Sequence, residues 1–178
     1  MIRETGMEMR VNPAWSRWMA AAALMLAAGC AADRPNPSAA LVGAWRSSVQ
    51  FDTGMFATVK GFEFLYVFNE GGTMTESSNY DAAPPVPPAY GVWRALGAGE
   101  FEARYEFFIT APSSPEAFKS GGGWLPSGRG ILTERIKLAD DGRSFTSSIR
   151  FEALDAAGKP AEGSGVGKGH ATRSTFES

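Results

Sequence analysis

Cysteine and histidine are nearly absent from this 178-residue chain, which has one of each. Cys30 is the only thiol, so no disulfide can form within the chain and a folded domain must be held together by its apolar core. His170 lies among glycines near the end of the sequence, with no second histidine for a catalytic triad or a metal cluster. A lone histidine is more often structural or solvated than catalytic. We therefore expect neither a metal nor a cofactor.

Several other sequence signatures are missing. The net charge is −2 and no basic run is visible, which argues against a nucleic-acid partner. The chain has no Gly-x-Ser-x-Gly or HExxH motif, and "GSGVGKG" at 163–169 lacks the GK[ST] ending and the following helix of a phosphate-binding loop. The uncharged stretch 18–29 is shorter than the roughly 20 apolar residues that cross a bilayer. These absences make an enzyme the less favoured class.

The N-terminal segment has the order of parts found in a secretory signal. Three arginines come first, then the apolar stretch, then small residues that end at Cys30. An Ala/Pro-rich segment with little to bury follows it, which favours a tether over a buried helix. We expect a cleaved signal peptide over 1–29, a tether over 30–40, and one domain over 41–178, long enough for a core of its own.

Leu26-Ala27-Ala28-Gly29-Cys30 resembles the lipobox of bacterial lipoproteins. The resemblance implies that the chain is cut before Cys30 and that this cysteine is acylated, which makes a membrane its partner. Two or more acyl chains anchor a protein stably. The residue after the cysteine is Ala31 and not aspartate, which in such lipoproteins implies the outer membrane, facing the periplasm.

The remaining sequence predicts a small antiparallel β protein, because apolar and polar residues alternate in short runs between turn residues. Strands are expected over 43–51, 61–70, 73–79, 89–96, 101–110, 128–139, 144–155 and 163–174. The connection 111–127 contains Ser114-Pro115-Glu116, typical of the start of a short helical turn. Alternating glycines in the last strand suit a face pressed against bulky neighbours, or a bend. Sequential hairpins of this kind predict an eight-stranded up-and-down barrel.

Gly43-Ala44-Trp45 resembles the Gly-x-Trp motif that opens the first strand of lipocalins and related calycins. The resemblance implies that Trp45 plugs one end of the barrel and that Arg173, from the last strand, packs across it. The Thr-Asp-Tyr turn of that family has no counterpart here. The family also implies a barrel that binds a small hydrophobic molecule.

Aromatic residues are the main candidates to line such a cavity, although most must simply form the core. The candidate ligand-binding residues, together with one acid, are Phe64, Tyr66, Trp93, Tyr105, Phe107, Trp124 and Glu134. Trp124 follows three glycines and is expected outside any strand. It either pins its loop, the favoured role, or forms a lid over the barrel mouth.

Glu134 is the one candidate for acid–base chemistry, and two orientations fit the sequence equally. If Leu132 and Ile136 face the core, the pleat points Glu134 inward with them. A buried acid needs a partner, here Arg104, Arg135 or a tyrosine such as Tyr66. If the other face of this strand is the inner one, Glu134 is solvated.

Three functions remain open at this point. The favoured one is a membrane-anchored envelope protein whose barrel binds a small hydrophobic molecule. The second is a barrel isomerase, cyclase or hydrolase that uses Glu134. The third is a filled barrel that contacts another envelope protein. A large apolar cavity would favour the first function. A buried Glu134 paired with an arginine in a polar cavity would favour the second, and a filled core with an exposed apolar patch the third.

Overall fold

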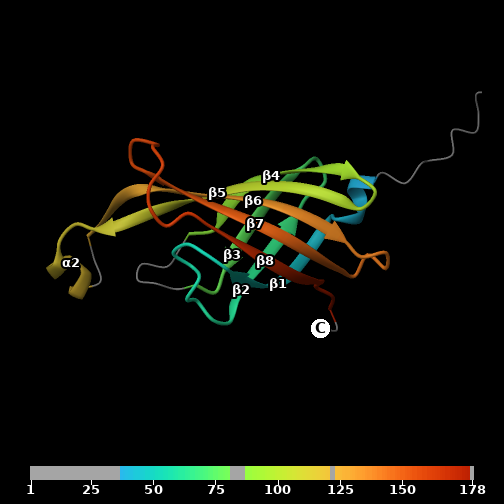
Figure 1. The fold of residues 1–178 in the computed structure, drawn as a ribbon, viewed down its shortest axis with the longest axis horizontal. Coiled ribbons are helices and arrows are strands. Elements are labelled where there is room, and N and C mark those ends of the chain that lie inside the picture. Colours follow the sequence, from blue (N-terminus) through green and yellow to red (C-terminus); the bar gives the residue numbers. More distant parts are fainter. Residues whose placement is uncertain (1–36, 81–86, 121–122, 177–178) are drawn as a thin grey trace, which may run out of the picture. The chain divides into compact units, whose positions relative to one another are not determined.

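The structure, a computed structural model, describes residues 37–80, 87–120 and 123–176, and within these ranges eight strands form a closed antiparallel barrel (Figure 1). The strands are β1 (Gly43–Phe51), β2 (Phe62–Phe68), β3 (Thr73–Ser78), β4 (Ala89–Gly97), β5 (Glu100–Pro112), β6 (Trp124–Leu138), β7 (Ser144–Asp155) and β8 (Gly165–Arg173). Two short helices accompany them, η1 (Pro37–Ala40) and α2 (Pro115–Ser120). The signal segment and Cys30 lie outside the described residues, whereas η1 falls within the segment expected to be tether.

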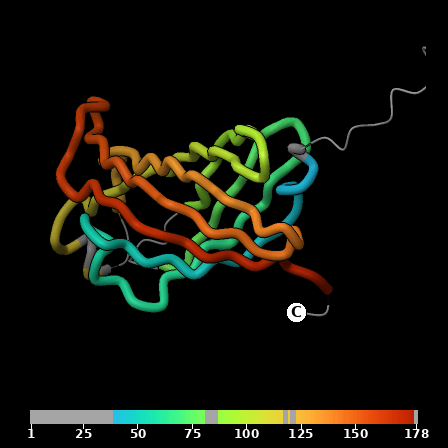
Figure 2. Tube along the Cα trace, turned by 45° about the vertical axis from the view of Figure 1, so that its right-hand side comes forward, coloured from blue at the N-terminus to red at the C-terminus, as the bar shows by residue number. Residues whose placement is uncertain are grey.

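Each strand pairs with its neighbours in the sequence, and β8 returns to pair with β1. This closing ladder runs from Trp45 opposite Arg173 to Phe51 opposite Gly167, and Figure 2 shows the two strands side by side. Closure gives every strand of the barrel wall a neighbour on both sides, and only the extension of β5 and β6 beyond the wall is two-stranded. The predicted up-and-down barrel is confirmed.

Alternation along the strands decides which side chains face the interior. In β7, for example, Phe145, Ile149 and Phe151 are buried while the residues between the inward positions are exposed or half-buried. The glycines of β8 allow close packing inside: a Cβ on Gly167 would lie 2.7 Å from the carbonyl oxygen of Gln50. Glycine is therefore needed where β8 meets the wall of β1.

Both ends of the connection expected over 111–127 are strand, which corrects that prediction. β5 continues to Pro112 and β6 begins at Trp124, directly opposite it, so Trp124 lies in a strand and not in a loop. Past Glu106 β5 has no further partner in β4, and before Gly128 β6 has none in β7. In this two-stranded ribbon a proline can face away from the ladder without loss of a hydrogen bond. The predicted helical turn is present as α2, at the tip of the ribbon (Figure 1).

One end of the barrel is closed by Trp45, which is fully buried against Phe145 with ring centroids 5.0 Å apart. Its indole Nε1 donates a hydrogen bond to the carbonyl oxygen of Leu41, at 2.9 Å. The Arg173 guanidinium lies 4.2 Å from the centre of the Trp45 ring. It also donates to the carbonyl oxygens of Val42 at 2.7 Å and Gly142 at 3.0 Å. Arg173 thereby ties the last strand to the segment that precedes β1.

Gly43 is required beside this contact, and its replacement should be costly. Its φ is +133°, and a Cβ there would lie 2.8 Å from the guanidinium of Arg173. Gly43→Ala is expected to lower the free energy of unfolding by about 1–3 kcal/mol, from backbone strain and displacement of Arg173. Gly61→Ala is the control, because Gly61 also has a positive φ, +64°, but nothing within 4 Å of the added Cβ. If urea denaturation shows the same loss in free energy of unfolding for both variants, the contact with Arg173 has no role.

The opposite end of the barrel is covered by Phe56, from the connection between β1 and β2. Its ring packs against Phe51, Phe62, Tyr80 and Phe151, with centroid distances from 4.9 to 5.6 Å. Phe56 is only 8% exposed despite its place in a loop. Aromatic rings therefore lie across both ends of the described barrel.

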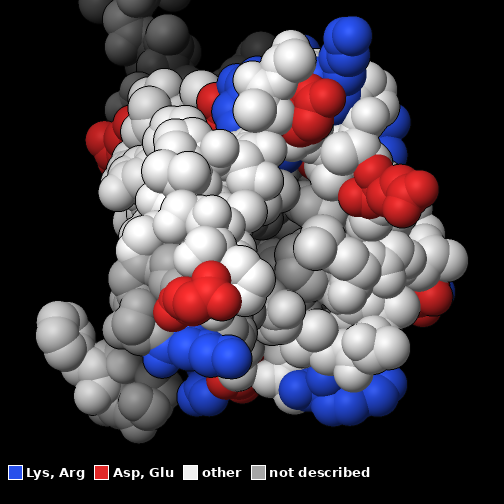
Figure 3. All heavy atoms as spheres, turned by 90° about the vertical axis from the view of Figure 1, so that its left-hand side faces the viewer, with Lys and Arg blue, Asp and Glu red and all other residues white. Residues whose placement is uncertain are grey.

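The outer surface carries charges of both signs. In the view of Figure 3, acidic and basic side chains are mixed around the end of the barrel, and neither sign forms a continuous patch. One part of the wall is apolar: Leu65, Val67, Tyr90 and Val92 project outward from β2 and β4 and are 43–64% exposed. No helix in the described part of the chain has the length and apolar character needed to span a bilayer.

Candidate functional site

Polar side chains form a cluster in the middle of the barrel interior. Four buried polar residues belong to the described core, and each comes from a different strand: Ser47, Glu76, Glu134 and Ser147. The hydroxyl groups of Tyr66 and Tyr105 join them from β2 and β5, and both tyrosines are 1% exposed. We call these six residues the polar cluster.

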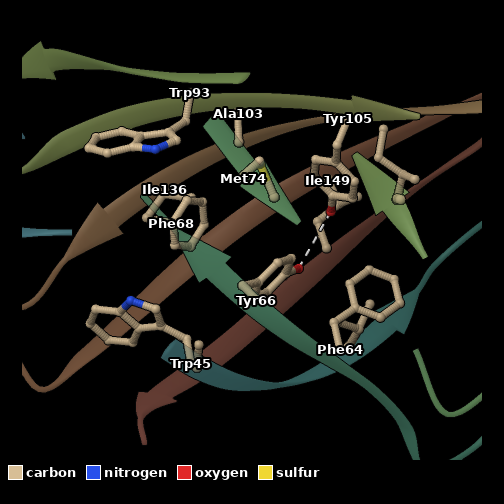
Figure 4. Packing of buried hydrophobic residues seen from close by; sticks show 14 of the residues in the cluster. Trp45, Phe64, Tyr66, Phe68, Met74, Trp93, Ala103, Tyr105, Ile136 and Ile149 are labelled. Atoms are coloured by element: carbon tan, nitrogen blue, oxygen red, sulfur yellow. Dashed lines mark hydrogen bonds between the residues drawn. The ribbon is translucent and has the colours of Figure 1, made fainter. Parts of the chain in front are cut away.

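The two tyrosines converge on one carboxyl oxygen. Tyr66 and Tyr105 each donate a hydrogen bond to Oε2 of Glu134, both at 3.0 Å. Their own hydroxyl oxygens are 3.5 Å apart, and Figure 4 shows the two rings pointing toward each other across the interior. Glu134 is fully buried, so of the two orientations open to the sequence the inward one is present.

The other carboxyl oxygens have less support. Within the described residues no group donates a hydrogen bond to Oε1 of Glu134 or to Oε1 of Glu76. The hydroxyl of Ser147 faces Glu134 but lies outside hydrogen-bond geometry with any described group. Buried polar atoms are nearly always hydrogen-bonded to protein or water, so these three atoms are the positions in the cluster where a water molecule or a ligand would find a hydrogen-bond partner.

Burial dominates the electrostatics of both acids. It raises the pKa of Glu76 to about 8, with a further contribution from the nearby charge of Glu134. Burial also raises the pKa of Glu134, and the hydroxyls of Ser147, Tyr105 and Tyr66 partly offset the rise. The pKa values of both tyrosines lie well above the ordinary value, again mainly because of burial. At neutral pH the carboxyl of Glu76 is therefore largely protonated in the empty cluster.

The arginines considered as partners of Glu134 lie elsewhere. Arg135 is on the outer face of β6, where it forms an ion pair with Glu102 at 3.0 Å. Arg104 is exposed on the outer face of β5. Neighbouring residues in a strand point to opposite faces, so the pleat that buries Glu134 excludes Arg135. Of the three partners predicted for Glu134, only Tyr66 forms a hydrogen bond with it, and Tyr105 is a second partner that was not predicted.

Aromatic side chains lie on both sides of the polar cluster. Phe64 packs against the ring of Tyr66, at 5.8 Å between centroids, on the side of Phe56. Phe107 is farther toward that end, stacked 6.2 Å from Phe151. Trp93 lies on the side of Trp45 (Figure 4), with its Nε1 donating to the carbonyl oxygens of Asn69 and Thr73.

Not every candidate residue belongs to this interior. Trp124 is ten residues before Glu134 in β6, a separation of roughly 33 Å along an extended strand. His170 is exposed on the outer face of β8, opposite Thr146 of β7. No group of three or more metal-binding side chains of the His, Cys, Asp or Glu types occurs among the described residues.

Glu76, Ser47 and Ser147 were not among the predicted site residues, although alternation could have found them. Each lies two positions from a residue that is plainly apolar and inward, as Glu76 does from Met74 and Ser147 from Phe145. Together with Glu134, these three residues place hydrogen-bond acceptors in the barrel interior, and none of them is positively charged.

Comparisons of the chain with protein families, with curated proteins and with solved structures gave no match.

Proposed function

We propose that this protein binds a small molecule inside its barrel, with an apolar part against the aromatic residues and a polar group at the polar cluster. The observation that carries the proposal is the set of buried, unpartnered oxygens of Glu76 and Glu134 between two aromatic layers. Ligand pockets are built in this way, from apolar walls with a few polar groups that fix orientation. Eight strands leave just enough interior space for side chains or for one small ligand.

The proposal includes a place in the cell. Cys30, acylated after cleavage of residues 1–29, would hold the barrel at the bacterial outer membrane on its periplasmic side. Support comes from the lipobox-like residues 26–30 alone. The lipocalin-like Gly43-x-Trp45 motif and the packing of Arg173 on Trp45 support a binding role in the same indirect way.

The test is mass spectrometry of the full chain extracted from an envelope fraction. Under native conditions we expect an additional discrete mass that is lost on denaturation, which is the retained ligand. The denatured chain should then have the mass of residues 30–178 plus its acyl groups. A chain that carries no small molecule in repeated preparations contradicts the binding role, and an unmodified N-terminus contradicts the anchor.

A second function has one observation in its favour. The apolar strip consists of Leu65 and Val67 on β2 and Tyr90 and Val92 on β4, and Thr75 of β3 lies between them, paired with both Val67 and Tyr90. Exposed apolar patches are typical of protein contact surfaces. A clean, ligand-free mass would shift the preference to a filled barrel that contacts another envelope protein through this strip.

A further inference from the structure

Three buried oxygen atoms of the polar cluster lack a hydrogen-bond partner among the described residues. Oε1 of Glu76, Oε1 of Glu134 and Oγ of Ser147 can each accept a hydrogen bond, and none has a partner within hydrogen-bond geometry among the described residues. The Ser147 hydroxyl faces Glu134 and can also donate, which leaves its oxygen lone pairs as acceptors. The side chains of all three residues are at least nine-tenths buried, with exposed fractions of 6%, 0% and 9%. An acceptor left without a donor in such a place is destabilising. The cluster is therefore arranged for a group with several hydrogen-bond donors.

The interior also contains two acids and no base. No lysine, arginine or histidine of the described ranges is buried, and Arg173 is held by backbone carbonyls at the Trp45 end. The residues that line this level of the barrel from each of its strands are Ser47, Tyr66, Glu76, Gly91, Tyr105, Glu134, Ser147 and Gly169. The only titratable groups facing one another are thus two carboxyls and two phenols. Any compensating positive charge must come with a ligand.

We propose that the polar cluster binds the primary ammonium group of a small amine whose remaining part is apolar. This inference rests on the proposed binding function and names its ligand class. A primary ammonium has three N–H donors and no acceptor, which matches the three unpartnered acceptors of Glu76, Glu134 and Ser147. The rings of Tyr66 and Tyr105 add a favourable environment for a cation.

The same chemistry excludes a carboxylate ligand such as a fatty acid. Its head group would meet two carboxyls and would find only the Tyr66 and Tyr105 hydroxyls, which already donate to Glu134. A buried carboxylate with no basic group beside it has a large desolvation cost, and the described interior holds no lysine, arginine or histidine to offset that cost. A neutral alcohol is tolerated, but it offers one donor to three acceptors.

Binding of an ammonium releases a proton. The carboxyl of Glu76 is neutral at pH 7 in the empty barrel, since burial raises its pKa to about 8. The ammonium favours the carboxylate, so the neutral acid plus the cation give an ion pair and one free proton. Below that pKa the apparent affinity is expected to rise about tenfold per pH unit. It should level off near pH 8 while the amine itself stays charged.

Three probes with the same phenylethyl part test the proposal with the full-length protein. 2-Phenylethylamine, 2-phenylethanol and 3-phenylpropanoate share an aromatic part and differ in the polar end. By isothermal titration at pH 7.5 the amine should bind at least about tenfold more tightly than the alcohol, and the acid should not bind. The binding enthalpy of the amine should change with the ionisation enthalpy of the buffer, which reports the released proton.

Glu76→Gln and Glu134→Gln keep the size of each side chain and remove its charge. Each is expected to abolish the preference for the amine over the alcohol and the pH dependence of binding. Glu152→Gln, at a half-buried site on the outer face of β7, is the control and should change neither. Thermal unfolding of each variant checks that the barrel is intact, and two independent acids keep the test valid if one variant does not fold.

The outcomes separate the two proposals. The ammonium site is overturned if 2-phenylethanol binds as tightly as 2-phenylethylamine, or if the affinity for the amine does not change between pH 6 and 8. The proposal of a ligand-binding barrel is unaffected by either result. A retained natural ligand without a basic nitrogen likewise overturns the ammonium site only. If none of the three probes binds and the extracted protein carries no molecule, both proposals are wrong.

Discussion

The free energy of unfolding of the ligand-free protein is expected to fall by about 3–4 kcal/mol between pH 5 and pH 8, with Glu76 as the main cause. Folding raises the pKa of Glu76 to about 8 from an ordinary value of 4.5. A carboxyl with a raised pKa binds its proton more tightly in the folded state than in the unfolded one. Its contribution is therefore complete below pH 4.5 and is lost as the pH rises through the window up to about 8. The raised pKa of Glu134 acts in the same direction.

Urea denaturation at pH 5, 6, 7 and 8 measures this dependence. Glu76→Gln should remove most of the slope and be more stable than the wild type at pH 8, because glutamine has no charge to desolvate. Glu152→Gln on the outer face should keep the wild-type slope. A Glu76→Gln variant with an unchanged slope would show that this carboxyl does not titrate in the window.

Trp45→Ala is expected to lower the free energy of unfolding by about 3–5 kcal/mol, the range for large aromatic residues removed from a packed core. Trp45 is fully buried and contacts Phe145, the guanidinium of Arg173 and, through its indole N–H, the carbonyl of Leu41. Its loss opens a cavity at the closed end and leaves the Leu41 carbonyl without its donor. Trp45→Phe keeps part of the packing, so its free energy of unfolding should lie between those of the wild type and Trp45→Ala.

Trp124→Ala provides the comparison, because Trp124 is half-buried and lies on the two-stranded ribbon outside the barrel. Its replacement should cost clearly less. The urea midpoints of the three variants at pH 6 give the order directly. Equal losses for Trp45→Ala and Trp124→Ala would mean that the end plug does not contribute specially to the barrel.

Most of the fold could be predicted from the sequence because its signals are local and repeated. Each strand has period-two alternation and most strands are followed by turn residues, and sequential hairpins of eight strands have few ways to close. The β5–β6 ribbon could not be predicted, for an equally local reason. The segment contains Pro112, Pro126 and three consecutive glycines, which are typical of a loop. Only the pairing of the two strands with each other, past the ends of their other neighbours, makes them extended there.

The candidate site was predicted less completely. Glu134 and both tyrosines were identified, but Arg104 and Arg135 were considered as partners, although the pleat places them outside. Glu76 was overlooked because a single glutamate between a methionine and serines gives no motif. What unites Glu76 with Glu134 is the barrel itself, which brings β3 and β6 to opposite sides of one interior. No spacing along the chain encodes that distance.

The pairing of β1 with β8, which we call the seam, also affects how this protein folds. Arg173 binds the carbonyl of Val42, 131 positions earlier in the chain, so the last contact needed to close the sheet is among the most distant in sequence. Topologies dominated by such contacts fold slowly, on a timescale of roughly milliseconds to seconds. Until β8 is in place, β1 presents an open edge to any other chain nearby. A nascent barrel is thus exposed to aggregation until its final strand arrives, and variants that weaken the seam should reveal themselves first in refolding yield.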